Sequence, residues 1–595
     1  MSDYDFFKGW LVQNTTTEQM DGAMPKVPAT ILMDLTDAGA KLPVAANAQI
    51  VVSSRDANPP VVALPALARV VNRQFWKTAG GYPHLSLARS SLGLRVSFFF
   101  FAHQCPHPTH ERVSDFVSMR RHQPSSDISW TRDAILYQIF PDRFARDRQT
   151  TKPGSGLAPW RSKPTTHGFM GGTLRGITER LDYLLDLGVN LIYLTPIFFA
   201  SANHRYNTYD YYRIDPRLGT LADFQNFLSK AHAKGIRVLL DGVFNHCGRG
   251  FFPFFDVMER GPASPFTSWF HITRFPVNAF GHFTYQGWQE RPIMPILNLA
   301  NPVTRRYFLD VAAYWTNQGI DGWRLDAVVD VRGHRFWKAL WQKVKTINPS
   351  AYMLAEIWRP ARQWVRDGQF DGGTNYVFRQ VVLDYFIQDS ISTRKFVSRV
   401  SNLLRMYRWE QTLAMVNVLG SHDTERIYTL ARGNIERLKL AMLFQFVFPG
   451  IPAMYYGDEI GMEGGKDPDN RRGMEWNQTK WNHELRDFTK RLVAIRKSLL
   501  TLRQGDWTVI QVLPAHQCCV FLRKAQRAFV FILIHNGDRP TSIQIDIAPW
   551  VGKTARWLED QLTGNKFKCE QGKVVLSDLG TRSGMILTLV KQACA

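Results

Sequence analysis

Cysteine is scarce in this sequence. There are six cysteines in 595 residues, and their spacing matches no set of metal ligands. Cys518 and Cys519 are adjacent in a strand-like run, so their side chains are expected on opposite faces of that strand. Neither a disulfide framework nor a cysteine-bound metal is therefore expected, and a reducing compartment is the default.

Long hydrophobic runs are also missing. The apolar stretch Phe98–Phe101 is far too short to span a bilayer. The first residues, Met-Ser-Asp-Tyr-Asp, lack the basic segment and the apolar segment of a secretory signal. We therefore expect no membrane partner and a cytoplasmic protein.

Negative charge is in short supply, because 51 Asp and Glu stand against 73 Lys and Arg, which gives a net charge of +22. A basic balance can indicate a nucleic-acid or membrane partner. Here the basic residues are scattered, and the densest pieces, such as Arg305-Arg306 and Arg471-Arg472, are short. No nucleic-acid-binding motif accompanies them, so a solvated basic surface without a nucleic-acid partner is favoured.

The chain does contain many hydrophobic residues, 45% of its 595. A chain of this length is too long for a single hydrophobic core, so about two to four domains are expected. Residues 1–130 hold short apolar runs separated by Pro, Gly, Asn and Asp, which predict an N-terminal β-sandwich. These runs are Thr30–Met33, Ile50–Val52, Val61–Leu64 and Leu94–Phe101.

Alternating apolar runs return at the end of the chain. They predict a C-terminal antiparallel β-sandwich over residues 506–595. The runs are Trp507–Val512, Cys519–Arg523, Ala528–His535, Ser542–Ile547 and Met585–Val590.

Between these regions, residues 131–505 alternate short apolar runs with helical patterns. Such alternation predicts a parallel sheet, and eight repeats predict a (β/α)8 barrel of the α/β class. A long segment rich in Phe, Pro and Gly, residues 247–301, follows the third strand and is expected to form an excursion over the active site. The predicted strands are Ala134–Phe140, Gly188–Pro196, Ile236–Asp241, Asp321–Asp326, Tyr352–Glu356, Gly373–Tyr376, Met415–Gly420 and Ile451–Gly457.

Carboxylates stand at the ends of several predicted strands. Asp241, Asp326 and Glu356 end the third, fourth and fifth strands, and Asp423 follows the seventh. Because the catalytic side chains of such barrels lie at the carboxyl ends of the strands, these residues are expected on one rim. So many carboxylates indicate acid/base chemistry on an uncharged substrate.

These segments resemble the ordered motifs of the α-amylase family, glycoside hydrolase family 13, over residues 132–500. Three further segments strengthen the resemblance: Met294–Asn298 is similar to the excursion motif of neopullulanases, Gly450–Gly461 to the motif of the eighth strand, and His204–Tyr211 to the loop with a sugar-stacking tyrosine. Within the family the chain is most similar to cyclomaltodextrinase, neopullulanase and maltogenic amylase, with maltodextrin glucosidase as a near neighbour.

The resemblance implies a retaining mechanism with Asp326 as nucleophile and Glu356 as acid/base. It implies that Asp423 binds the 2- and 3-hydroxyls of the reacting sugar. Retention requires the first two carboxyls to lie about 5–5.5 Å apart, which adjacent strand ends can provide. Arg324 shares a face with Asp326 and can lower its pKa, whereas negative neighbours and burial would raise that of Glu356.

The resemblance also implies a set of substrate-binding residues: Tyr206, Asp241, His246, Arg324, His422, Asp467 and Arg471. Tyr206 would stack beneath the sugar, and the two histidines would donate to its hydroxyls. For Asp241, orientation of Arg324 is favoured over contact with substrate. Asp467 and Arg471 would line the next subsite, and Trp358 is either a stacking ring on the leaving-group side or part of the core.

Two positions depart from the subgroup pattern. Asp330 stands where the neopullulanase type has glutamate, and Ile296 stands where it often has lysine. In the segment Ala145–Gln149, where some relatives bind calcium, two arginines oppose an ion that needs six to eight oxygen ligands. We expect no obligatory metal and no organic cofactor.

The function expected from the sequence is hydrolysis of α-1,4 bonds in cyclodextrins and maltodextrins. A maltodextrin glucosidase, a transglycosylase and an inactive glucan-binding protein are the alternatives. The partner is an α-glucan oligosaccharide, and the resemblance implies a homodimer built through the N-terminal domain.

Overall fold

The computed structural model describes most of the chain beyond residue 125 and three strands before it. The chain forms two compact units, Met1–Arg120 and Arg121–Ala595. The described residues are 30–33, 48–53, 95–100, 126–148, 156–278, 283–331, 333–366, 368–554 and 557–590.

In the first unit the described strands form an antiparallel sheet in the order β1-β2-β3. They are β1 (Thr30–Met33), β2 (Ala48–Ser53) and β3 (Arg95–Phe100). Three of the four predicted runs therefore coincide with strands. The fourth, Val61–Leu64, lies outside the described residues.

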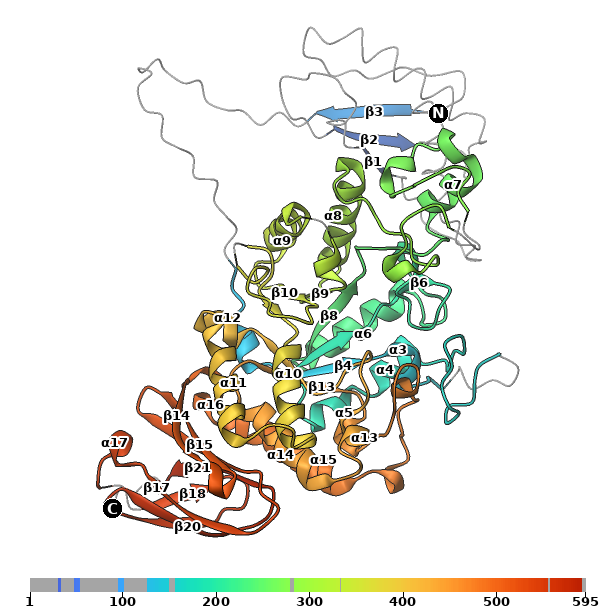
Figure 1. The fold of residues 1–595 in the computed structure, drawn as a ribbon. Helices are drawn as coiled ribbons and strands as arrows, with labels where there is room; N and C mark the ends of the chain where they lie inside the picture. Colours follow the sequence, from blue (N-terminus) through green and yellow to red (C-terminus); the bar gives the residue numbers. More distant parts are fainter. Residues whose placement is uncertain are drawn as a thin grey trace, which may run out of the picture. The chain divides into compact units, whose positions relative to one another are not determined.

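The second unit is built on the predicted barrel (Figure 1). Eight parallel strands follow one another around it in chain order, and a parallel bridge between Thr374 and Val416 joins its two end strands. Each of the eight predicted segments overlaps one of these strands, but Gly373–Tyr376 does so only at Gly373, because Tyr376 already begins a helix. The strands are β4 (Leu136–Ile139), β5 (Leu191–Leu194), β8 (Arg237–Gly242), β9 (Gly322–Leu325), β10 (Tyr352–Ala355), β11 (Gly372–Gly373), β12 (Val416–Val418) and β13 (Ile451–Tyr455).

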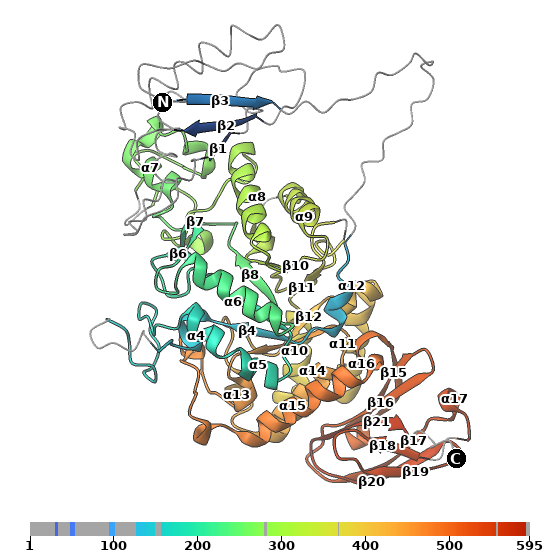
Figure 2. The ribbon, with the colours of Figure 1, turned by 180° about the vertical axis from the view of Figure 1, so that it is seen from behind.

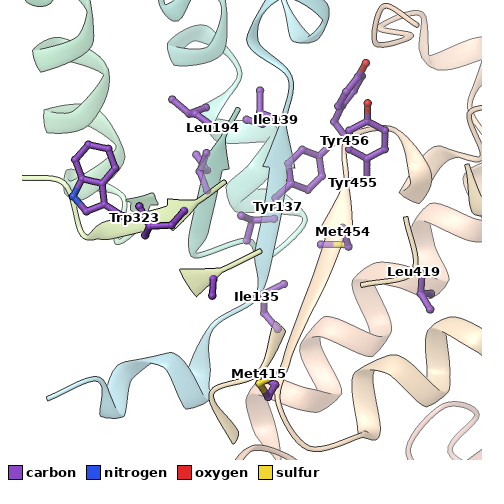
Figure 3. Close-up of a cluster of buried hydrophobic side chains, with 14 of the residues drawn as sticks. Ile135, Tyr137, Ile139, Leu194, Trp323, Met415, Leu419, Met454, Tyr455 and Tyr456 are labelled. Carbon is purple, nitrogen blue, oxygen red and sulfur yellow. The ribbon is translucent and has the colours of Figure 1, made fainter. Parts of the chain in front are cut away.

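Side chains alternate between the barrel lumen and the surrounding helices, as the pleat of a strand requires. Leu136, Leu191 and Leu239 belong to the lumen cluster, whereas their neighbours along the strands pack outward. Figure 3 shows part of the buried cluster to which these neighbours belong, with Ile135, Tyr137, Ile139, Leu194, Trp323, Met415, Leu419, Met454, Tyr455 and Tyr456 labelled.

Helices cover the outside of the barrel (Figures 1 and 2). In α6 the Thr220 side chain caps the first turn reciprocally with Asp223, and Phe224, Leu228 and Ala231 face inward at helical spacing. The main helices are α4 (Leu174–Glu179), α5 (Leu181–Asp186), α6 (Leu221–Ala233), α8 (Pro302–Asn317), α9 (Arg335–Ile347), α10 (Tyr376–Val382), α11 (Thr393–Arg405), α14 (Ile435–Val447), α15 (His483–Ser498) and α16 (Leu500–Gln504).

The predicted excursion lies between β8 and α8. It contains α7 (Phe252–Arg260), and it returns to the barrel through an antiparallel bridge between His246 and Ile296. A second bridge, between Gly287 and Pro295, closes a tight loop that carries Trp288. The excursion is thereby fixed to the end of β8, beside the barrel rim.

The chain ends in an eight-stranded antiparallel sheet that packs against α11, α14 and α16. Cys518 lies in the core of this sheet domain, whereas Cys519 joins the cluster shared with the barrel, so the predicted opposite orientation is confirmed. The strands are β14 (Asp506–Leu513), β15 (Cys518–Ala525), β16 (Ala528–His535), β17 (Thr541–Asp546), β18 (Trp557–Asp560), β19 (Lys566–Glu570), β20 (Lys573–Leu579) and β21 (Ser583–Leu589).

No helix in the described part of the chain has both the length and the apolar character needed to cross a bilayer.

Candidate active site

Arg324 lies at the centre of the rim formed by the carboxyl ends of the barrel strands. Its Nη1 is 3.0 Å from both carboxylate oxygens of Asp241 and 2.8 Å from Oδ1 of Asp326. Its Nη2 is 2.8 Å from Oε1 of Glu356. One buried guanidinium therefore holds three of the predicted carboxylates together.

The strand register explains this convergence. Arg324 on β9 pairs with Asp241 on β8 and with Leu354 on β10. Because side chains alternate along a strand, Asp326 lies on the same side as Arg324, and Glu356 on the same side as Leu354. The strand-end carboxylates are thus directed to one point of the rim.

Asp326 uses one carboxylate oxygen and leaves the other free. Its Oδ1 accepts from Arg324, whereas its Oδ2 is buried and has no hydrogen-bond partner among the described residues. Burial raises the pKa of Asp326 well above its usual range, the charge of Glu356 raises it further, and Arg324 opposes both. The lowering effect predicted for Arg324 on the pKa of Asp326 is present but is outweighed by burial.

Both oxygens of Glu356 have partners. Oε1 accepts from Arg324 and, at 3.2 Å, from Nε1 of Trp358, and Oε2 accepts from the backbone N–H of Ala327 at 3.0 Å. Ala327 follows Asp326 in the left-handed region, with φ of 48°, a conformation that persists only where the surroundings impose it. This turn ties the position of Glu356 to that of Asp326.

A chain of hydrogen bonds enters the site from β4. Nε2 of Gln138 lies 2.6 Å from Nδ1 of His422, and because an amide nitrogen can only donate, Nε2 of His422 carries the proton. That nitrogen is 2.7 Å from the hydroxyl of Tyr206, which donates to Oδ2 of Asp241 at 2.9 Å. Burial lowers the pKa of His422 well below its usual value, with Arg471 and Arg324 adding to the effect, so the ring is neutral.

Asp241 is the most heavily bonded carboxylate of the site. Besides Arg324 and Tyr206 it accepts from the hydroxyl of Tyr193 on β5 at 2.5 Å. Burial raises the pKa of Asp241 to about 6, although Arg324 and the two tyrosyl hydrogen bonds favour its charged form. The geometry agrees with the expected role of orienting Arg324.

Tyr206 is held in place by the residue before it. Arg205 has a left-handed backbone with φ of 62°, and its fully buried guanidinium pairs with the equally buried Asp215 at 2.9 Å. The ring of Tyr206 lies parallel to that of His422, with 5.3 Å between centroids and 7° between planes. A strained backbone locked by a buried ion pair thus presents Tyr206 to the rim.

Asp423 lies at the open edge of the site. Its Oδ2 is 3.1 Å from His422 and its Oδ1 is 3.3 Å from Nη2 of Arg471, while its side chain remains 29% exposed. Burial raises the pKa of Asp423, and Arg471 and Arg324 oppose the rise. Arg471 also pairs with Asp467 at 3.1 Å, so these predicted residues form one group.

The loop carrying His422 and Asp423 is held from behind by Asn470. The buried amide of Asn470 donates to the carbonyl oxygens of His422 and Thr424 at 2.7 and 2.9 Å. Arg471 donates to the same His422 carbonyl at 2.8 Å. The position of Asp423 is therefore fixed by the backbone as well as by its own contacts.

His246 stands apart from Arg324, against the excursion. Its ring stacks on Trp288, with 4.8 Å between centroids, and its buried Nε2 has no hydrogen-bond partner among the described residues. Burial lowers the pKa of His246 to about 3, so the ring is neutral. Trp288 in turn donates to Oδ2 of Asp330 at 2.7 Å, which links the excursion to the loop after β9.

Trp358 is a surface ring at the rim. It is 51% exposed and stacks face to face on Tyr376, with 3.7 Å between centroids and 6° between planes. One face of the indole is thus covered, and the alternative that Trp358 belongs to the core is wrong.

Reasoning from the sequence did not name Gln138, Tyr193, Asn470 or Trp288 among the residues of this site. Gln138 and Tyr193 lie within buried strands, where a polar group on the lumen face requires a partner. That requirement was a signal the sequence contained. Asn470 carried no comparable signal, because its role depends on how two loops meet.

Two aspartates in the described part of the segment after β4, where calcium was considered, accept hydrogen bonds from the protein. Asp142 accepts from the backbone of Met170 at 2.9 Å, and Asp147 accepts from Thr173 at 3.0 Å. Among the described residues, no three His, Cys, Asp or Glu side chains are grouped as a metal ion would require.

The chain is similar to known proteins in both sequence and structure. The family described as alpha amylase, catalytic domain, matches residues 138–498. The chain is 40% identical over 479 residues to a cyclomaltodextrinase of Geobacillus thermopakistaniensis, covering 80% of each chain, and 38% identical over 477 residues to neopullulanase 2 of Thermoactinomyces vulgaris, covering 80% of this chain and 81% of the relative. Among solved structures, cyclic α-maltosyl-(1→6)-maltose hydrolase from Arthrobacter globiformis is 36% identical with a TM-score of 0.70, covering 78% of this chain and all of that one.

Proposed function

The chain belongs to the α-amylase family of glycoside hydrolases, and from this premise we propose that it hydrolyses α-1,4 bonds of cyclodextrins and maltodextrins with retention. The names of its relatives, cyclomaltodextrinase and neopullulanase, support this choice of substrate. The observation that carries the mechanism is the sharing of Arg324 between Asp326 and Glu356, with Oδ2 of Asp326 left unpartnered.

In the first step Glu356 gives its proton to the glycosidic oxygen as the bond from that oxygen to the anomeric carbon breaks. Oδ2 of Asp326 forms the new bond to that carbon, which yields a covalent glycosyl-enzyme and a free 4-hydroxyl on the leaving glucosyl unit. With a cyclodextrin this unit remains part of the opened chain. In the second step Glu356 takes a proton from water, whose oxygen displaces Asp326. Two displacements restore the original α configuration.

The remaining residues bind and orient the sugar. Asp423 has exposed carboxylate surface for the 2- and 3-hydroxyls. Because the amide nitrogen of Asn245 donates to Nδ1 of His246 at 3.3 Å, the unpartnered Nε2 of His246 carries the proton and can donate to a hydroxyl. Tyr206 offers a ring whose tilt is fixed by Asp241 and His422. Asp467 and Arg471 extend the site toward the next glucosyl unit. Such contacts contribute to rate when they strengthen as the ring flattens in the transition state.

The test is to follow the products from β-cyclodextrin, maltoheptaose and pullulan over time, with the anomer of the first product read by NMR. Rapid ring opening, release of the α-anomer and loss of activity in Asp326→Asn are expected. In an Asp326→Ala variant, azide should restore turnover by replacing the nucleophile, with inversion. Release of the β-anomer by the unmodified protein would contradict the assignment of Asp326.

Product identity separates the alternatives. Glucose from maltoheptaose with slow ring opening would indicate a maltodextrin glucosidase, and products longer than the substrate would indicate transglycosylation. Binding of cyclodextrin without any turnover would indicate a glucan-binding protein.

We also propose that residues 1–130 form an N-terminal domain through which two copies pair, and that the protein works in the cytoplasm. The first proposal rests on the subgroup resemblance, and sedimentation at micromolar concentration should give a dimer. A monomer at that concentration would exclude it. The second is supported by Cys247, Cys518, Cys519 and Cys569, which are unpaired and buried, as in a reducing compartment.

A further inference from the structure

A concavity lined with arginine follows the catalytic strand end of β10. Its volume is about 440 Å³, and its wall comprises Arg359, Pro360, Arg362, Gln363, Trp364 and Arg366. We call Arg359, Arg362 and Arg366 the arginine bowl. All three side chains are exposed to solvent, whereas Trp364 is buried beneath them.

Two arginines of the bowl, Arg359 and Arg362, carry charge that no described carboxylate compensates. Among the described residues, neither Arg359 nor Arg362 pairs with a carboxylate, in contrast to the arginines around the active site. The guanidinium of Arg359 lies over the ring of Trp364, 5.1 Å from its centroid, a contact that orients the group without neutralising it. Like charges within eight residues repel one another, and a bound anion would relieve that repulsion.

The arginine bowl is adjacent to the proposed site of chemistry. Glu356 directly follows β10, the indole of Trp358 donates to its carboxylate, and Arg359 is the residue after Trp358. One face of Trp358 is covered by Tyr376, and the indole is otherwise half exposed. A sugar on the exposed part of the indole would therefore bring its substituents close to Arg359.

A neutral glucan has no group that needs several guanidinium forks. A phosphate monoester does, because it carries between one and two negative charges and three acceptor oxygens, which arginine binds bidentately. A nucleic acid would require a basic stripe that follows a backbone, whereas this bowl is confined to one short loop. We propose that the arginine bowl is a binding site for a phosphate group, carried by a sugar that lies against Trp358 or supplied as free phosphate.

The position of this site on the leaving-group side rests on the proposed function, but the phosphate site itself does not. Binding can be measured without turnover, in the unmodified protein and in the inactive Asp326→Asn variant. Loss of catalysis and loss of the phosphate site are therefore separate results.

The experiment is a titration followed by ³¹P NMR, with glucose 6-phosphate and inorganic phosphate in separate arms. In the double variant Arg359→Gln/Arg362→Gln, binding should weaken by at least about tenfold, the value of one lost charge-assisted contact. Arg527→Gln removes an exposed arginine from the C-terminal sheet domain and should leave binding unchanged. The Arg359→Lys/Arg362→Lys variant keeps the charge but loses the fork, so it should bind with intermediate affinity.

The two arms distinguish the sources. Tighter binding of glucose 6-phosphate than of phosphate, with the difference abolished by Trp358→Ala, would support the site as one for sugar phosphates. Equal binding of both, with the same arginine dependence, would support it as one for free phosphate. Absence of saturable binding, equal binding by the glutamine double variant, or equal weakening in Arg527→Gln would overturn the proposal.

Discussion

The active site has two halves of different construction. In the buried half, Arg324, Asp241, Tyr193, Tyr206 and His422 bond mainly to one another, and all five are buried. In the exposed half, defined by Trp358, Trp288 and Asp330, aromatic rings stand at the surface or are held by single contacts. Under the proposed function, the first half would fix the geometry of bond cleavage before substrate arrives, and the second would leave room for sugars of different shape.

The contrast has a physical origin. A buried polar group without a partner costs about 1–3 kcal/mol, so the buried half must be satisfied by the protein itself. Groups that satisfy one another cannot move separately, and this provides preorganisation for charge that develops in the transition state. The unpartnered Oδ2 of Asp326 is the exception, and it is the atom proposed to react.

The largest expected effect on turnover comes from replacing Asp326, whose Oδ2 lacks a partner among the described residues. Asp326→Asn should reduce turnover of β-cyclodextrin on the order of 10⁴-fold or more, because the amide cannot form the glycosyl-enzyme. The melting temperature should stay the same or rise, since one buried carboxylate no longer faces Glu356. Asp310→Asn, a half-exposed aspartate on α8, is the matched control and should keep full activity. A folded Asp326→Asn enzyme with near-normal turnover would contradict the role of Asp326 as nucleophile and the proposal that the buried half carries out bond cleavage.

Within the buried half, Tyr193→Phe removes one hydrogen bond from Asp241 without changing shape. We expect kcat to fall by about ten- to a hundredfold, because the buried carboxylate of Asp241 loses one of its hydrogen-bond donors. Burial sets the pKa of Asp241 at about 6, and the Tyr193 bond lowers it, so the pKa rises further in the variant. Activity is lost as pH falls and Asp241 takes up a proton that weakens its hold on Arg324. The acid limb of the pH–rate profile should therefore move to higher pH.

The control for this change is Tyr183→Phe. The hydroxyl of Tyr183 donates to Glu459, outside the Arg324 group, so its loss should leave the acid limb in place. An unmoved acid limb in Tyr193→Phe, or an equal displacement in both variants, would show that Asp241 does not govern the profile.

The two halves also differ in how far the sequence predicts them. Within the buried half, Asp241, Arg324 and His422 lie in or after short barrel strands, so strand position indicates that they share the rim. Tyr206 lies in a loop and was expected only from the family resemblance. Even within the strands, Gln138 and Tyr193 were missed, because each is a single polar residue inside an otherwise hydrophobic strand. Their partners become evident only once the lumen face of each strand is known.

The exposed half could not be predicted in the same way. The bond from Trp288 to Asp330 depends on a tight loop in which Gln289 and Glu290 both have positive φ, of 49° and 59°. Such residues give no sequence signal, since neither is glycine or asparagine. The fold shows the same limit: strands β18, β19 and β20 were not predicted, because their alternation is interrupted by charged residues on a largely exposed face.

In the exposed half, Trp358→Ala should raise KM for maltodextrins by about tenfold with a smaller change in kcat, because a stacked ring contributes about 0.5–1.5 kcal/mol beyond its buried area. Trp557→Ala removes a tryptophan of similar exposure, 43%, from β18 and should leave KM unchanged. Initial rates over a range of maltoheptaose concentrations measure both constants. A fall in kcat alone would mean that Trp358 acts with the buried half of the site, through its hydrogen bond to Glu356.

The smallest effect is expected where the excursion meets the barrel. Asp330→Ala removes the acceptor of the Trp288 indole, and one net hydrogen bond of about 0.5–1.5 kcal/mol corresponds to a change of two- to tenfold in KM for β-cyclodextrin. Asp330→Asn retains an acceptor oxygen, so its KM should stay close to that of the unmodified protein, which separates the effect of the hydrogen bond from that of the charge.

Because Trp288 also stacks on His246, freeing Trp288 from Asp330 should affect a rigid ring substrate more than a linear one that can adapt. Equal changes for β-cyclodextrin and maltoheptaose would mean that the excursion does not distinguish substrate shape, and that the exposed half contributes affinity without selectivity.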